Sequence, residues 1–176
     1  MKDLVQAASK VKLLVLDVDG ILSNGHIIYD ANGVETKFFN VKDGMGVKSL
    51  KLAGVKTAII TGRSSSMVNQ RAKEMGVDYV IQGRDDKLEA LKQLLLDLPI
   101  KLEECAYMGD DLPDIKALQS VGFSATVPNA HQEVLSRVLM VTTRVGGEGA
   151  VREVCDLILK GHGKYQEYIS KYILDN

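Results

Sequence analysis

The chain has 176 residues, enough for one domain with a substantial core. Its 22 basic and 23 acidic residues give a net charge of −1 and form no basic block, which argues against nucleic-acid binding. No apolar run is long enough to cross a bilayer and residues 1–6 carry no signal-peptide pattern, so the sequence predicts a cytoplasmic protein without membrane contact. Cys105 and Cys155 are interpreted as small buried side chains in a reducing compartment.

The first strong pattern lies at residues 11–20. Residues 11–16 are apolar except for Lys12, which is typical of a buried strand in a parallel sheet. Asp17 and Asp19 follow, and because side chains two residues apart in an extended segment point the same way, both should face one crevice. The carboxyl end of a strand is where open α/β sheets bind ligands. Two carboxylates this close repel unless a cation neutralises them or they share a proton.

A β-hairpin is predicted next, as an insertion over about residues 26–39. Asn32-Gly33 lies between two β-rich runs, residues 26–29 and 34–39, and this arrangement is a strong hairpin signal. We expect Phe38 and Phe39 to pack within the protein rather than to recognise a ligand.

The remaining chain alternates between strands and helices. Strands are expected over 55–60, 77–81, 105–108, 121–125 and 138–141. Helices are expected over 42–52, over 64–75 with serines as the cap, after the turn at 83–86, and over 113–119, 130–137 and 150–160. This alternation predicts a doubly wound α/β fold with a mostly parallel, Rossmann-like sheet, in a single domain of residues 1–176 with a C-terminal tail from about residue 161.

Polar residues follow four of these elements at what should be one edge of the sheet. They are Asp17 and Asp19, then Thr61-Gly62-Arg63, then Lys87 at a helix start, and finally Asp110, Asp111 and Asp114. In their order along the chain, Asp17-Val18-Asp19-Gly20, Thr61, Lys87 and the segment 109–114 resemble the four motifs of the haloacid-dehalogenase superfamily phosphatases. This resemblance implies that superfamily's fold and a phosphatase activity.

A narrower resemblance covers nearly the whole chain. The hairpin in place of a large cap domain, Lys42-Asp43-Gly44, Thr61-Gly62-Arg63 and the segment 146–153 are similar to the 3-deoxy-D-manno-octulosonate 8-phosphate phosphatase family. The resemblance implies a Mg²⁺-dependent phosphomonoesterase that acts on this sugar-acid phosphate in lipopolysaccharide precursor biosynthesis. It also implies a homotetramer in which hairpins of several subunits pair.

The chemistry of phosphate ester hydrolysis suggests a role for each motif. A carboxylate nucleophile, Asp17, would split the reaction into two displacements, and Asp19 would act as general acid and then base. Lys87 would stabilise charge on the phosphoryl group, and the Thr61 hydroxyl would hold its oxygens. Mg²⁺ prefers oxygen ligands, which Asp17 and Asp110 supply.

Further roles come from the resemblance or remain open. The family adds the backbone carbonyl of Asp19 as a metal ligand. Substrate contacts are expected at Gly44, Gly62, Arg63 and Arg144. Asp111 and Asp114 either support the metal site or serve the dipole of the following helix. The scattered residues His26, His131 and His162 do not suggest a zinc site.

Less specific interpretations and other functions compete with this one. Asp19 before Gly20 and Thr61 before Gly62 are also compatible with ordinary turns, and a lysine at a helix start is usually solvated. Alternative functions are a phosphatase for a related nonulosonate 9-phosphate, a non-catalytic oligomerisation module, and a phosphotransferase or mutase. The last would need an acceptor site that usually lies on a cap domain.

Overall fold

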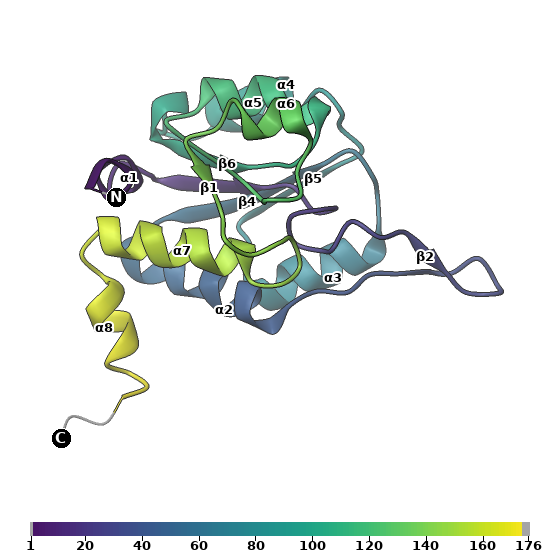
Figure 1. Ribbon diagram of the computed structural model, residues 1–176, viewed down its shortest axis with the longest axis horizontal. Helices are drawn as coiled ribbons and strands as arrows, with labels where there is room; N and C mark the ends of the chain where they lie inside the picture. Colours follow the sequence, from purple (N-terminus) through teal and green to yellow (C-terminus); the bar gives the residue numbers. More distant parts are fainter. Residues whose placement is uncertain (1, 174–176) are drawn as a thin grey trace.

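The computed structural model describes residues 2–173, and its centre is a sheet of six strands (Figure 1). In spatial order the strands are β5 (Tyr79–Gln82), β4 (Lys56–Thr61), β1 (Leu13–Leu16), β6 (Cys105–Met108), β7 (Phe123–Thr126) and β8 (Met140–Val141). Every neighbouring pair is parallel. The chain order reverses at β1, which lies between β4 and β6, and such a switch point is where open α/β sheets hold ligands. The predicted doubly wound α/β fold is confirmed.

Helices cover both faces of the sheet (Figure 1). One face carries α1 (Lys2–Ala8), α2 (Val41–Ser49), α3 (Ser66–Met75) and α7 (Ala150–Gly161), followed by α8 (Tyr165–Ile169). The other carries α4 (Lys87–Leu96), α5 (Ile115–Ser120) and α6 (Gln132–Leu135). Three short 3₁₀ helices complete the described chain: η1 (Leu50–Ala53), η2 (Leu102–Glu104) and η3 (Leu112–Asp114). None of the helices in the described part of the chain is long and apolar enough to span a bilayer.

Strand β1 is buried on both faces, which explains its continuous apolar sequence. Leu14 and Leu16 join the core beneath α2 and α7, whereas Leu13 and Val15 join the core beneath α4 and α5. All four side chains are fully buried. The same two-residue alternation turns Asp17, the next residue in phase with Leu13 and Val15, toward the α4 face.

Local capping differs from the sequence expectation at helix α3. Helix α3 does begin after Ser65, but no serine side chain caps it, so that prediction was wrong. Instead, the backbone N–H of Ser65 donates to the Gln82 side chain at 2.7 Å. Helix α2 begins after Asn40, whose side chain accepts from the backbone N–H of Lys42 at 2.8 Å. Helix α1 had no counterpart among the expected elements.

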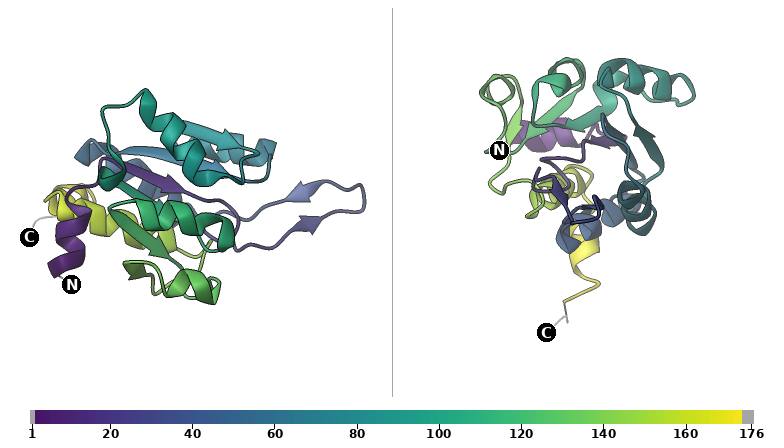
Figure 2. Two further views of the ribbon diagram at one scale, coloured as in Figure 1. Left: turned by 90° about the horizontal axis from the view of Figure 1, so that it is seen from above. Right: turned by 90° about the vertical axis from the view of Figure 1, so that its right-hand side faces the viewer.

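The predicted hairpin is confirmed and projects away from the sheet (Figure 2). Its antiparallel strands are β2 (Ile28–Tyr29) and β3 (Glu35–Thr36). Asp30 organises the loop because its Oδ1 accepts from the backbone N–H groups of Asn32 and Val34. The expected packing of Phe38 was wrong within one chain, since this side chain is 60% exposed. Phe39 does pack against the core.

The C-terminal tail begins as expected after α7. Its helix α8 is anchored by Tyr168, which is buried against the core beneath α7. The part of the predicted tail beyond residue 173 lies outside the described residues.

Candidate active site

A crevice of about 490 Å³ opens at the carboxyl edge of the sheet and brings residues from all four predicted motifs together. Its lining residues are Asp17, Asp19, Gly20, Gly25, Thr61, Gly62, Arg63, Asp85, Lys87, Asp110, Asp111 and Pro113. Segments that are far apart in the sequence therefore meet at the point where β1, β4 and β6 end.

Asp17 and Lys87 form a buried ion pair at the base of the crevice. The Lys87 ammonium donates to Asp17 Oδ2 at 2.7 Å, and the backbone N–H of Val18 donates to Asp17 Oδ1 at 2.7 Å. Lys87 is the first residue of α4, on the sheet face toward which Asp17 points. Burial lowers the pKa of Lys87, but the charges of Asp17 and Asp114 outweigh this effect and the net pKa is raised. Lys87 is therefore a fixed cation next to Asp17.

Asp114 holds Lys87 from the other side. Its carboxylate is fully buried, and Oδ1 accepts from Lys87 Nζ at 2.7 Å and from the Tyr107 hydroxyl at 2.9 Å. Oδ2 accepts from the backbone N–H groups of Asp110 and Asp111 at 3.1 and 3.2 Å. Burial, followed by the charges of Asp114 and Asp17, raises the pKa of Tyr107 well above its usual value, so its hydroxyl remains a donor. Asp114 is thus saturated with donors.

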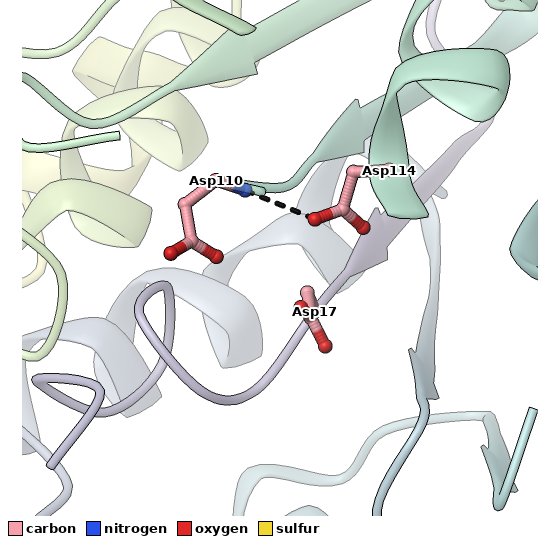
Figure 3. A group of neighbouring side chains, drawn as sticks. All are labelled: Asp17, Asp110 and Asp114. Atoms are coloured by element: carbon pink, nitrogen blue, oxygen red, sulfur yellow. Dashed lines mark hydrogen bonds between the residues drawn. The ribbon is translucent and has the colours of Figure 1, made fainter. Parts of the chain in front are cut away.

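Asp110 presents a carboxylate that accepts from no donor among residues 2–173. In the part of the chain that the structure describes, Asp17, Asp110 and Asp114 bring carboxylate oxygens within 4.8 Å of one another (Figure 3). Burial and then the charge of Asp114 raise the pKa of Asp17 from 3.8 to about 6, although Lys87 opposes this. Burial and then the charge of Asp17 raise the pKa of Asp110 from 3.8 to about 7. Gly20 makes room for Asp110: its φ is +86°, and a Cβ there would lie 2.1 Å from Asp110 Oδ2.

Asp19 lies at the side of the crevice, where the hairpin joins the sheet. Its Oδ1 accepts from Lys37 Nζ at 2.5 Å, and its Oδ2 lies 3.7 Å from Arg63 Nε. Arg63 Nη2 donates to Glu35 at 2.7 Å and lies 3.4 Å from the Tyr29 hydroxyl. Hairpin residues therefore reach both predicted active-site residues, Asp19 and Arg63.

The structure places two predicted substrate contacts, Gly44 and Arg144, outside the crevice. Gly44 packs against α3, where a Cβ would lie 2.4 Å from Arg71 Nη2. The neighbouring Asp43 is fully buried and accepts from the backbone N–H groups of Gly149 and Arg152, at the start of α7. Arg144 is exposed and lines a different pocket. Gly44 lies within α2, and its neighbour Asp43 connects this helix to the start of α7. Within one chain, this part of α2 does not reach the crevice.

Comparison with known proteins identifies the family. Residues 79–154 match the haloacid dehalogenase-like hydrolase family. The chain is 44% identical over 165 residues to the 3-deoxy-D-manno-octulosonate 8-phosphate phosphatase of Escherichia coli strain K12, covering 94% of this chain and 88% of that protein. The chain belongs to the 3-deoxy-D-manno-octulosonate 8-phosphate phosphatase family.

Solved structures agree with this assignment. This chain superimposes with a TM-score of 0.96 on a phosphatase of this family from Moraxella catarrhalis. That structure is a complex with a magnesium ion, a phosphate ion and a molecule of KDO, the abbreviation for 3-deoxy-D-manno-octulosonate. It is 51% identical and the match covers 98% of this chain and 99% of that chain. The cobalt-bound Haemophilus influenzae phosphatase is 35% identical with a TM-score of 0.89, covering 94% and 97% of the two chains.

The residues of this chain fit a magnesium ion. In the described part of the chain, no group donates a hydrogen bond to the Asp110 carboxylate, whereas burial and neighbouring charge penalise its ionised form. Burial and neighbouring charge also penalise the ionised form of Asp17. A hard cation bound between Asp17 and Asp110 would favour the ionised form of both carboxylates. Asp17 and Asp110 would hold the ion, together with the predicted backbone carbonyl of Asp19. Asp114 cannot readily join them because its oxygens already accept four hydrogen bonds.

Asp110→Asn is expected to stabilise the metal-free protein at neutral pH. Because the pKa of Asp110 is higher when folded than when unfolded, folded protein binds this proton more tightly. The contribution of protonated Asp110 to the free energy of unfolding is therefore fully present below about pH 4, and it is lost as the pH rises to about 7. With chelator, the variant should unfold about 3 °C above the wild type at pH 8 and at the wild-type temperature at pH 4.

Saturating Mg²⁺ is the matched comparison for this experiment. It should raise the unfolding temperature of the wild type at pH 8 more than that of Asp110→Asn, because the variant lacks one ligand. A variant that is less stable than the wild type in chelator at pH 8 would contradict the proposed carboxylate repulsion. Thermal unfolding followed by circular dichroism measures both effects.

Sequence reasoning missed several residues that contact the predicted active-site groups, among them Lys37, Glu35 and Tyr107. A signal existed for Tyr107, since a tyrosine in an otherwise fully buried strand needs a partner for its hydroxyl. Nothing in the sequence marked Lys37 or Glu35, because alternating polar residues are ordinary on a hairpin.

Proposed function

We propose that this chain is a single-domain, Mg²⁺-dependent phosphatase that hydrolyses 3-deoxy-D-manno-octulosonate 8-phosphate to the sugar acid and phosphate. The observation that carries this proposal is the match, over 98% of the chain, to a Moraxella catarrhalis phosphatase in complex with magnesium, phosphate and KDO. The crevice of this chain supports it with a buried Asp17–Lys87 pair and with Asp19 and Asp110 on its walls.

In the first step, the Asp17 carboxylate attacks phosphorus and the bond between phosphorus and the sugar oxygen breaks. Asp19 gives its proton to that oxygen, so the sugar leaves as a neutral alcohol. Lys87, 2.7 Å from Asp17 Oδ2, balances negative charge next to the phosphoryl group. Thr61 and Gly62 lie at the end of β4 and line the same crevice, where they hold phosphoryl oxygens.

In the second step, water attacks the phosphorus of the aspartyl phosphate and Asp19 takes the proton of that water. The bond between phosphorus and Asp17 breaks, which restores the carboxylate and releases phosphate. Mg²⁺, when bound, would reduce the charge repulsion between Asp17 and the phosphate dianion. Arg63 lies at the mouth of the crevice, where its guanidinium would bind the anionic sugar acid.

A phosphate-release screen tests the proposed substrate. It compares 3-deoxy-D-manno-octulosonate 8-phosphate, a nonulosonate 9-phosphate and ordinary sugar phosphates, each with Mg²⁺ and with chelator. We expect the highest kcat/KM for the octulosonate and no turnover in chelator. A higher kcat/KM for the nonulosonate would favour the alternative substrate, and no turnover of any phosphate would favour a non-catalytic assembly module. The assembled catalytic set argues against that module, which needs none of these residues.

We also propose that the protein is a homotetramer in which hairpins pair. Two hairpin strands of two residues each cannot form a stable unit in water. Apolar side chains gather on and beside the hairpin, and Ile27, Tyr29, Val34, Phe38 and Val41 are between 51% and 74% exposed. A closed symmetric assembly would bury these side chains and the hairpin edges.

Removal of residues 27–38 should convert the tetramer to monomers with weak and less specific turnover. The deletion removes four of these five exposed apolar side chains, all but Val41, and also the contacts of Lys37 and Glu35 with the active site. Light scattering measures the mass, and the substrate screen measures specificity. An active wild-type monomer at assay concentration would contradict the tetramer.

A cytoplasmic location is part of the same proposal. Cys105 and Cys155 are free and buried. Burial raises the pKa of Cys105 to about 12, which keeps this thiol protonated and unreactive. Free thiols are most common in reducing compartments.

A further inference from the structure

Lys37 is the most deeply buried charged residue of the hairpin. Its side chain is only 1% exposed, although it follows β3 in a segment that projects from the sheet. The ammonium donates to Asp19 Oδ1 at 2.5 Å and lies 3.3 Å from Glu35 Oε1. Since burying an ammonium is costly unless it is paired, Lys37 is held in place by these two carboxylates.

The contacts of Lys37 distinguish the two oxygens of Asp19. Oδ1 accepts from Lys37 and, at 3.3 Å, from the Ser23 hydroxyl. Oδ2 has the Arg63 guanidinium at 3.7 Å, beyond hydrogen-bond distance. Lys37 does not line the crevice, whereas Asp19 does. Of the two carboxylates that Lys37 contacts, Asp19 is therefore the one through which it reaches the crevice directly.

We propose that Lys37 is a positioning residue for Asp19. Together with Ser23 it holds Oδ1, which leaves Oδ2 as the oxygen that gives the proton to the leaving sugar and takes the proton of water. The proposal rests on the proposed phosphatase function and adds to it a hairpin residue that fixes the acid and base. Holding a catalytic group in one orientation matters because a misplacement of about 1 Å can cost a factor of 10² in rate.

Glu35 extends this arrangement across the crevice. Its side chain is 15% exposed and contacts both Lys37, at 3.3 Å, and Arg63, at 2.7 Å. Asp19 follows β1 and Arg63 follows β4, so the hairpin residues Lys37 and Glu35 join the ends of two neighbouring strands. The hairpin is thereby connected to the active site of its own subunit.

The test compares two substrates in Lys37→Met and Asp19→Asn variants. A sugar phosphate has a poor leaving group that needs the proton from Asp19, whereas p-nitrophenyl phosphate needs it far less. Lys37→Met should lower kcat about tenfold or more for the sugar-acid phosphate but less than about threefold for p-nitrophenyl phosphate. KM should change little, because Lys37 does not touch the substrate. Lys48→Met, an exposed lysine at the end of α2, is the matched control.

The double variant, Lys37→Met with Asp19→Asn, gives the decisive comparison. If Lys37 acts through Asp19, the double variant should be no slower than Asp19→Asn alone. Equal losses on both substrates, a further loss in the double variant, or loss of the tetramer by light scattering would each overturn the proposal. Lys37→Gln, which keeps a donor, replaces Lys37→Met if that variant does not fold.

The experiment separates this proposal from the proposed substrate. If the wild type cleaves p-nitrophenyl phosphate but not the sugar-acid phosphate, the proposed substrate is wrong. Lys37 is then tested with whichever alkyl phosphate the wild type cleaves fastest, and the same pattern of losses is expected.

Discussion

Asp17→Asn should lower phosphate release by at least about 10³-fold, because loss of a nucleophile leaves only binding and charge stabilisation. The amide is a poor nucleophile but has almost the same shape, so the backbone contact with Val18 and the core beneath β1 should persist. The substitution also removes a negative charge next to Asp110. The metal-free variant should therefore be at least as stable as the wild type at pH 8.

Phosphate release with Mg²⁺ and thermal unfolding measure these two effects. Asp111→Asn is a suitable comparison, since Asp111 lines the crevice but its side chain caps the start of η3 by accepting from backbone N–H groups there. We expect that variant to lose far less activity. Turnover by Asp17→Asn within tenfold of the wild type would exclude Asp17 as the nucleophile.

Lys87→Met should damage both activity and stability. Lys87 is 5% exposed and lies 2.7 Å from carboxylate oxygens of Asp17 and Asp114, so its removal leaves two buried acids uncompensated. Breaking a buried ion pair on one side costs about 3 to 5 kcal/mol of unfolding free energy. Loss of a cation placed at the developing charge costs about 10²-fold or more in kcat.

Lys92→Met on the same helix is the control, because Lys92 is exposed and its ion pair with Glu89 lies at the surface. Denaturant unfolding at pH 7.5 and pH 4 adds a second check. Protonation of Asp17, whose pKa is raised to about 6, removes part of the unpaired negative charge, so the destabilisation by Lys87→Met should shrink at the lower pH. A loss of unfolding free energy below about 1 kcal/mol at pH 7.5 would show that the buried pair is not essential.

Much of the fold could be predicted from local patterns. The apolar run before Asp17, the alternation of strands and helices, and the Asn32-Gly33 turn each depend on neighbouring residues, and each is confirmed. Helix α1 was not recognised because its seven residues are too few to establish a helical period in the sequence. The prediction for the cap of α3 was wrong because three consecutive serines offer a cap in sequence, yet none of their side chains accepts from the first turn of the helix.

The candidate site was predictable where motif residues follow strands, and less so where contacts are long-range. Asp17, Thr61, Lys87 and Asp110 lie together because parallel strands end at one edge. The contact of Lys37 with Asp19 spans 18 residues and depends on how the hairpin leaves the sheet. Gly44 does not line the crevice within one chain, and a glycine required for packing against Arg71 looks the same in sequence as one required for a ligand.

The separation of Asp17 and Lys87 along the chain also bears on folding. These residues lie 70 positions apart, and Lys87 reaches Asp17 only after β4 and β5 have joined β1. Non-local parallel pairing of this kind forms slowly compared with single helices. During refolding, helical signal should therefore return before phosphatase activity, and the recovery of activity would report on the completed sheet.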